Sequence, residues 1–149
     1  MTIPVGTRRR MSNHVAKNAS LIDVRLHDIS ARLLGTVGKT PLRPSIKVDA
    51  NFGRAQAFAL YDYTYELEAT DDSGKSVFRA AFALNLVFRL TDSESVTAEE
   101  LEAFGSFGVA EIAHPYVREL IHNLTFRMGL PPFILEVAPP IVDQATVAG

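Results

Sequence analysis

Residues 57–90, AFALYDYTYELEATDDSGKSVFRAAFALNLVFRL, decide the fold, because they predict two long strands joined by a tight turn. Odd-numbered positions of 57–69 are apolar or aromatic, and every even-numbered position of 78–90 is apolar. A period of two is typical of strands that bury one face. The segment 71–74, Asp-Asp-Ser-Gly, is typical of a hairpin turn. The stretch therefore predicts an antiparallel hairpin.

The second strand of this hairpin is apolar on its other face too. Among its odd-numbered positions 77–89, the overtly polar residues are Arg79, Asn85 and Arg89. A strand with two apolar faces is expected to be covered on both sides, in this case by helices on one face and by a partner subunit on the other. We therefore expect Phe82, Leu84 and Leu86 to lie at an oligomer interface or beneath one.

Two further strands are predicted upstream. Residues 21–33 alternate, but the apolar set moves from even to odd positions after His27. Because a shift of one residue exchanges the faces of a strand, we predict a β-bulge near Asp28 that keeps both halves buried. Residues 46–52 form the other strand, after a loop rich in Gly and Pro.

The chain downstream of the hairpin predicts helices. Thr97 and Glu100 have the spacing of a capping box, and Val96 and Leu101 that of a hydrophobic staple. Gly105 and Gly108 should interrupt this first helix.

A second helix is predicted over 109–128, with a kink at Pro115 and a C-terminal cap at Gly129. Residues 133–137 are interpreted as a short strand. The fold class is thus α+β, with a four-stranded antiparallel sheet packed by a broken, Pro-kinked helix pair.

The length of 149 residues predicts one domain. We expect a flexible basic N-terminal arm over 1–18, or a first helical turn there, a folded domain over 19–142 and a frayed tail over 143–149. Residues 1–50 hold nine bases against three acids, which leaves six bases against fourteen acids in the rest. This asymmetry favours a solvated basic arm over a nucleic-acid patch.

Composition excludes several classes of protein. Without cysteine there is no disulfide framework and no thiolate metal or redox site. A formal net charge of −2 argues against a dedicated nucleic-acid binder. No apolar run reaches the roughly 18 residues of a membrane span, and none follows Arg8 to Arg10 as in a signal peptide. A cytoplasmic protein without membrane insertion is expected.

Motifs for chemistry are weak. The four histidines, at positions 14, 27, 114 and 122, do not have the spacing of metal ligands, and no phosphate loop or nucleophile motif is present. We therefore predict no enzyme activity, no metal and no cofactor.

Aromatic residues are the more informative feature. Tyr61, Tyr63 and Tyr65 share one strand face, and Phe104 and Phe107 flank the glycines at the helix break. We interpret these five residues as the lining of a groove for extended apolar peptide. The competing interpretation is ordinary core packing.

The stretch 114–138, HPYVRELIHNLTFRMGLPPFILEVA, resembles the C-terminal half of the SecB protein-export chaperones. The likeness includes Pro115, Tyr116, Arg118 and Glu119, then Arg127 and the prolines at 131 and 132. The Asp-Ile-Ser at 28–30 is similar to the family's first strand. Residues 99–104 and 124–132 are closer still to SecB-like chaperones of mycobacterial toxin–antitoxin–chaperone systems.

This resemblance implies a holdase without ATPase activity. Its clients would be unfolded polypeptides, either preproteins for export or an antitoxin, and the chain would assemble as a tetramer, a dimer of dimers. Asp28 matches one acidic residue with which the family docks the translocation ATPase SecA. Arg32 and Ala81 stand where other acids are expected, which argues against that docking.

Two other classes of function remain open from the residues alone. One is a small-ligand-binding or enzymatic α+β domain, for which Asn85 is the candidate buried polar group. The other is an assembly or regulatory subunit without a client.

Overall fold

The computed structural model describes residues 3–36, 41–131, 135, 139–142 and 146–147. Its elements, in chain order, are α1 (Val5–Lys17), β1 (Ala19–Leu33), β2 (Arg43–Ala55), β3 (Phe58–Thr70), β4 (Ser76–Leu90), the 3₁₀ turn η1 (Ser93–Ser95), α2 (Ala98–Ser106), α3 (Gly108–Arg127) and β5 (Thr146–Val147).

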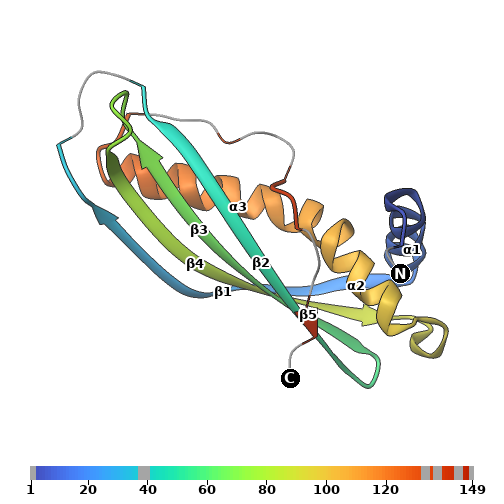
Figure 1. Ribbon diagram of the computed structural model, residues 1–149. Coiled ribbons are helices and arrows are strands. Elements are labelled where there is room, and N and C mark those ends of the chain that lie inside the picture. Colours follow the sequence, from blue (N-terminus) through green and yellow to red (C-terminus); the bar gives the residue numbers. More distant parts are fainter. Residues whose placement is uncertain (1–2, 37–40, 132–134, 136–138, 143–145, 148–149) are drawn as a thin grey trace.

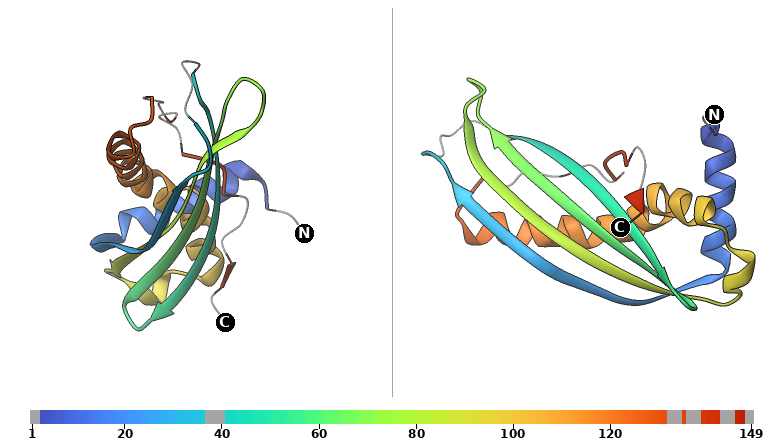
Figure 2. Two further views of the ribbon diagram at one scale, coloured as in Figure 1. Left: turned by 90° about the vertical axis from the view of Figure 1, so that its left-hand side faces the viewer. Right: turned by 60° about the horizontal axis from the view of Figure 1, so that its bottom comes forward.

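One sheet organises the chain, with strand order β1-β4-β3-β2-β5 (Figure 1). The four long strands pair antiparallel, and β5 adds two residues in parallel to β2. Helices α2 and α3 run along one face of the sheet, and α1 lies at the α2 end (Figures 1 and 2). The predicted α+β class and four-stranded antiparallel sheet are confirmed.

The central hairpin forms as predicted. Asp71 Oδ1 accepts hydrogen bonds from the backbone N–H groups of Ser73 and Lys75, both at 3.0 Å, and Gly74 has φ +81°. The positive φ is readily adopted by glycine. The Ser73 hydroxyl, followed by the Lys75 N–H, lowers the pKa of Asp71.

The bulge in β1 also forms. Leu26 pairs with Leu84 and Asp28 with Ala83, so His27 is the extra residue. A second register shift, between Leu21 and Asp23, was not predicted. The two shifts place Leu21, Val24, Leu26, Ile29, Ala31 and Leu33 on the same face of the strand, although the alternation changes phase along the sequence.

Local signals fix both ends of the helix pair. Thr97 and Glu100 make both hydrogen bonds of a capping box, and α2 ends at Ser106, so that Phe107 alone separates it from α3. Gly108 is required there, because a Cβ atom would stand 2.4 Å from the Phe104 ring. At the end of α3, the Leu130 N–H donates to the Thr125 carbonyl across Gly129, whose φ is +70°. This is the predicted glycine cap.

The structure at the two ends of the chain differs from the predictions. Residues 5–17 form a helix and not a flexible arm, because Val15 and Ser12 are buried against the rest of the chain. Residues 146–147 pair with β2, although a frayed tail was predicted. The strand predicted over 133–137 lies outside the described residues, apart from Leu135.

The core lies between the sheet and the helices. It includes Tyr61, Phe78, Phe88, Leu101 and Phe104, each at most 1% exposed. Within the described residues, no helix has the length and apolar character of a membrane span.

Candidate functional site

The sheet has two faces of different character. The face toward the helices, here called the inner face, carries the odd-numbered residues of β3 and the even-numbered residues of β4, which are buried almost throughout. The outer face carries their neighbours, most of which are exposed or half-buried. Each predicted site residue can be placed on one of these faces or on a helix.

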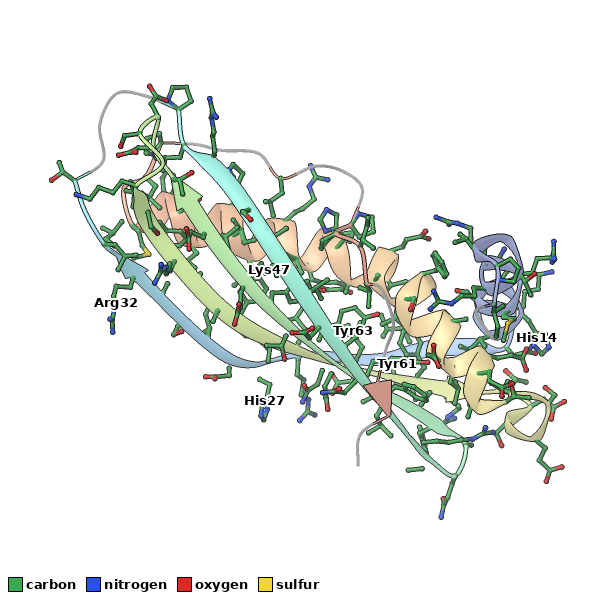
Figure 3. All side chains as sticks on the ribbon, in the orientation of Figure 1. His14, His27, Arg32, Lys47, Tyr61 and Tyr63 are labelled. Carbon is green, nitrogen blue, oxygen red and sulfur yellow. The ribbon has the colours of Figure 1, made fainter. Side chains whose placement is uncertain are left out.

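Tyr61, Tyr63 and Tyr65 lie on the inner face and are at most 2% exposed. The Tyr61 hydroxyl donates to the Leu101 carbonyl at 2.7 Å, and the Tyr63 hydroxyl donates to the Gly105 carbonyl. Burial raises the pKa of all three phenols well above the ordinary value. Figure 3 shows Tyr61 and Tyr63 between the sheet and α2, where they bind the two layers together.

The expectation that these tyrosines are open to solvent is therefore corrected. Phe104 is also in the core, at 1% exposure, with its ring edge-on to Tyr61 and Phe88. The alternation of β3 identified the buried face correctly, but the helices already fill the space over it. Of the five predicted groove residues, Phe107 alone is half-buried and not buried.

The structure likewise places Phe82, Leu84 and Leu86 in the core of the single chain, at 2%, 5% and 0% exposure. They lie on the inner face, next to β1 and β3, so little of their surface is left for direct contact with a partner. A position beneath an interface stays a prediction. The exposed apolar surface of the sheet lies on the neighbouring strand.

Strand β1 carries that surface. Leu21, Leu26, Ile29 and Leu33 pair with Phe88, Leu84, Phe82 and Phe78 of β4 and so point toward the inner face. Their exposed fractions are 38%, 46%, 38% and 43%. These four residues, here called the β1 strip, form a row of large aliphatic side chains that the helices leave uncovered.

The strip lies beside an open sheet edge. β1 is the last strand on its side of the sheet and has 15 residues, with no strand paired to its outer edge within the described part of the chain. A long edge with apolar side chains offers unpaired backbone N–H and C=O groups together with hydrophobic area. Such an arrangement fits an extended polypeptide.

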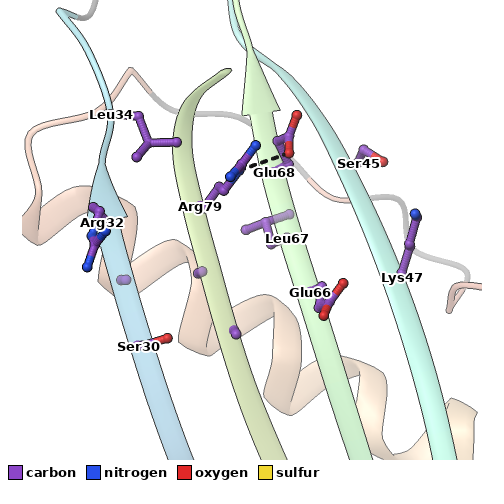
Figure 4. Close-up of a pocket in the computed structure, with 12 residues that line it drawn as sticks. Ser30, Arg32, Leu34, Ser45, Lys47, Glu66, Leu67, Glu68 and Arg79 are labelled. Atoms are coloured by element: carbon purple, nitrogen blue, oxygen red, sulfur yellow. Dashed lines mark hydrogen bonds and ion pairs between the residues drawn. The ribbon is translucent and has the colours of Figure 1, made fainter. Parts of the chain in front are cut away.

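The outer face of the sheet is hollowed near the turn between β3 and β4 (Figure 4). This hollow, of about 630 Å³, is lined by small residues, including Ser30, Ser45 and Ala81, and by charged ones, including Arg32, Lys47, Glu66 and Arg79. Asp28, the predicted partner-docking residue, is exposed on β1 opposite Ala83. The charges of this face are mixed and not uniformly acidic.

Helix α1 packs against the junction between α2 and α3. Arg8 donates to the Ser106 hydroxyl at 2.8 Å, and the Gly108 N–H donates to the Ser12 hydroxyl at 3.1 Å. The guanidinium groups of Arg8 and Arg9 lie 5.4 Å and 4.7 Å from the centre of the Phe107 ring. These contacts join α1 to the break between the two helices.

His14 of α1 contacts Glu100 at the start of α2. Partial burial raises the pKa of Glu100, but hydrogen bonds from Thr97 and His14 outweigh this effect and leave the pKa below its ordinary value. The described residues contain no group of three His, Asp or Glu side chains placed to hold a metal.

Sequence reasoning missed the β1 strip although its signal was present. The alternation of 21–33 predicted a half-buried strand, and its apolar residues were assigned to the core. Being first in sequence says nothing about whether a strand lies at an edge, and the pairing of β1 with β4 alone is what exposes the strip.

Comparison with known proteins gives a likeness in structure. No family model matches the sequence, and no curated protein matches it. The fold is similar to that of the SecB-like chaperone Rv1957 of Mycobacterium tuberculosis, solved in complex with a ChAD peptide from the Rv1956 HigA1 antitoxin. The TM-score is 0.79 at 22% identity, over 88% of this chain and 98% of that one.

A protein of unknown function from Streptococcus agalactiae is also similar, with a TM-score of 0.46 at 11% identity, over 79% of this chain and 96% of that one. The first likeness confirms the SecB-like fold that the sequence predicted.

Proposed function

We propose that this protein is an ATP-independent chaperone that binds extended apolar segments of unfolded polypeptides and prevents their aggregation. The observation that carries the proposal is the β1 strip, four aliphatic side chains between 38% and 46% exposed in one row beside an open strand edge. The likeness in fold to a SecB-like chaperone supports it.

Hydrophobic contact suits a chaperone that accepts many clients. It is non-directional, so different sequences contribute area without matching polar groups. Burying one large aliphatic or aromatic side chain of a client supplies about 1.5–3 kcal/mol. A few such contacts along the strip hold an unfolded segment without trapping it, since part of the gain is offset by ordering the client.

The solved chaperone of similar fold supports a client class for this chain. That chaperone is bound to a peptide from an antitoxin. We propose that an antitoxin segment is the favoured client of this chain, with preproteins for export as the second class, both met in the cytoplasm. Docking of SecA is not part of the proposal, because the outer face has Arg32 and Ala81 where acids are expected.

Assembly belongs to the same proposal. We propose that the chain forms homo-oligomers, up to a tetramer built as a dimer of dimers, because β1 leaves a long edge and an apolar row uncovered in the single chain. A catalytic or small-ligand role is less well supported: Asn85, on which it rested, is half-buried on the outer face.

The test compares apolar side chains of similar exposed fraction on the two faces of the sheet. Leu26→Ser/Ile29→Ser removes half of the β1 strip, whereas Leu60→Ser removes a side chain that is 39% exposed on the outer face. The assay is light scattering of guanidine-unfolded citrate synthase diluted into each protein. We expect the double variant to need about tenfold more protein for half suppression, and Leu60→Ser to act as the wild type.

Circular dichroism and light scattering of each variant alone establish that fold and oligomer are retained. Full suppression by the folded double variant, or an equal loss in Leu60→Ser, would contradict the assignment of the strip.

A further inference from the structure

The outer face of β4 is open, although β4 lies between two other strands. Helices α2 and α3 run along the opposite face of the sheet (Figures 1 and 2). On the outer face, Ala81 is exposed and Ala83 is half-buried. These small residues belong to the second apolar face of this strand, for which the sequence predicted a covering partner. The hollow near the β3–β4 turn lies over Ala81.

The register of the four long strands orders the side chains around Ala81 in rows that cross the sheet. From the β3–β4 turn onward, the rows are Arg32, Arg79, Glu68 and Ser45, then Ser30, Ala81, Glu66 and Lys47, then Asp28, Ala83, Thr64 and Asp49. Neighbours within a row have Cβ atoms about 4.5–5.5 Å apart. The hollow, of about 630 Å³, spans the first two rows.

Two guanidinium groups border the hollow on the side of the turn. Arg32 and Arg79 stand directly opposite each other on β1 and β4. Arg79 Nε donates to Glu68 at 3.1 Å, on the side away from Arg32 (Figure 4). Arg32 makes no ion pair with any described residue. Because like charges directly opposite each other in a sheet are destabilising, an anionic group between the two arginines is favoured.

The other charges of the hollow leave this preference in place. Glu68 uses one donor of Arg79, and a guanidinium has five N–H donors, so others stay free for a ligand. Glu66 and Lys47 stand directly opposite each other, and their charges offset one another. Three bases and two acids thus line the hollow, and the excess positive charge lies at Arg32.

We propose that this hollow is a docking site for a short acidic segment of another protein. A carboxylate of that segment lies between Arg32 and Arg79, and its main chain lies over Ala81. The planar fork of an arginine matches a carboxylate, and hydrogen bonds between two charged groups are stronger than those between neutral ones. The inference goes beyond the proposed function, which uses the β1 strip on the opposite face of the sheet.

The lining of the hollow favours a peptide over a compact small molecule. Small-ligand sites of about 300–1,000 Å³ are mostly enclosed by apolar and aromatic side chains. Apart from Leu34 and Leu67, the residues that line this hollow are polar, charged or alanine. The hydroxyl groups of Ser30 and Ser45 are exposed there. They offer hydrogen bonds to the main chain of an extended segment.

The row beyond Ala81 limits how far the acidic stretch extends. Asp28 and Asp49 stand in this row, and Asp62 follows in the next one. These carboxylates repel a long polyanion such as a nucleic acid, which continues across them at the spacing of its phosphates. A peptide has no such constraint, because its acidic residues end at the hollow and neutral or basic residues face the aspartates. The charge pattern therefore specifies a protein segment with a short acidic stretch.

Fluorescence anisotropy at low salt tests the site, with a fluorescein-labelled peptide of sequence Gly-Glu-Ser-Glu-Gly as the probe. We expect saturable binding to the wild type, and binding at least about fivefold weaker in Arg32→Gln/Arg79→Gln. The same peptide with Gln in place of Glu should bind at least about fivefold more weakly to the wild type. Because the contacts are exposed, added salt should weaken binding of the Glu peptide.

Arg25→Gln/Arg89→Gln is the matched control. It removes the same two charges from the outer face of the same two strands, outside the hollow, where Arg25 pairs with Asp23 and Arg89 lies over the Phe58 ring. We expect it to bind the Glu peptide within about twofold of the wild type. Circular dichroism of both double variants establishes that the fold is retained.

Several results would overturn the site: no binding of the Glu peptide by the wild type, equal binding of the Gln peptide, or equal weakening in the control variant. Tighter binding of a Lys-containing peptide or of a labelled single-stranded oligonucleotide would overturn the class of partner. Arg32→Gln/Arg79→Gln should still suppress aggregation of citrate synthase as the wild type does. A loss of suppression in this variant would mean that the hollow and the β1 strip are not separate sites, whereas failure of the strip variants alone leaves the hollow unaffected.

Discussion

Strands β4 and β1 are neighbours with the same apolar alternation, but their apolar side chains differ in burial. On the inner face, the even-numbered residues of β4 from Phe78 to Leu90 are at most 5% exposed, whereas the β1 strip is 38–46% exposed. β4 has a paired strand on both sides, and β1 has one. The comparison teaches that alternation predicts which face of a strand is apolar, but position in the sheet decides whether that face becomes core or surface.

The largest expected contrast is between two residues that lie opposite each other. Phe82 and Ile29 are cross-strand partners, at 2% and 38% exposure. Phe82→Ala should lower the free energy of unfolding by about 3–5 kcal/mol, because it leaves a cavity in the core. Ile29→Ala should lower it by less than about 1.5 kcal/mol. Urea denaturation measures both, and equal losses would abolish the distinction between core and strip.

Alkaline pH should destabilise the fold through the three buried tyrosines. The folded pKa values of Tyr61, Tyr63 and Tyr65 are raised by burial. Their neutral forms therefore stabilise the fold fully below the unfolded pKa of about 10, and this stability is lost as pH rises above it. Each tyrosine should contribute a loss of about 1.4 kcal/mol per pH unit above pH 10. Denaturation at several pH values should show a shallower loss in Tyr65→Phe, and an unchanged slope would refute the role of this phenol.

The hydrogen bonds between sheet and helix offer a smaller test. Tyr61→Phe removes the hydrogen bond from the Tyr61 hydroxyl to the Leu101 carbonyl and should cost up to about 1.5 kcal/mol. Tyr116, which is 44% exposed on α3, is the matched control, and Tyr116→Phe should stay within about 0.5 kcal/mol of the wild type. Thermal melting separates the two. Equal effects would mean that the Tyr61 hydroxyl does not couple the layers.

The smallest expected effect concerns the start of α2. Thr97 accepts a hydrogen bond from the Glu100 N–H at 3.1 Å. Thr97→Ala should cost about 1 kcal/mol in urea denaturation, with no loss of client holding, because the cap leaves every side chain of the strip unchanged. A large loss of holding with normal stability would instead implicate α2 in client binding.

Much of the fold could be predicted because its signals are local. The hairpin at 71–74, the bulge at His27, the capping box at Thr97 and the glycine cap at Gly129 each depend on a few neighbouring residues. The SecB-like order of strands and helices followed from these elements and from the resemblance.

The candidate site could not be predicted in the same way. Burial of Tyr61 and Phe104 depends on α2 lying over β3, a contact between segments about forty residues apart in the chain. Exposure of the β1 strip depends on which strand lies at the edge of the sheet. Helix α1 was predicted as no more than a first helical turn, because residues 1–18 show no apolar periodicity and the helix depends on contacts with Ser106, Phe107 and Gly108.

The most direct test of the central claim is methyl NMR of the leucine- and isoleucine-labelled chain, titrated with an unfolded client that carries a paramagnetic label. The account predicts line broadening at Leu21, Leu26, Ile29 and Leu33, and none at Leu60 or at Ile141, which is 85% exposed. Broadening confined to Leu60 and the outer face, with the β1 strip unaffected, would contradict it.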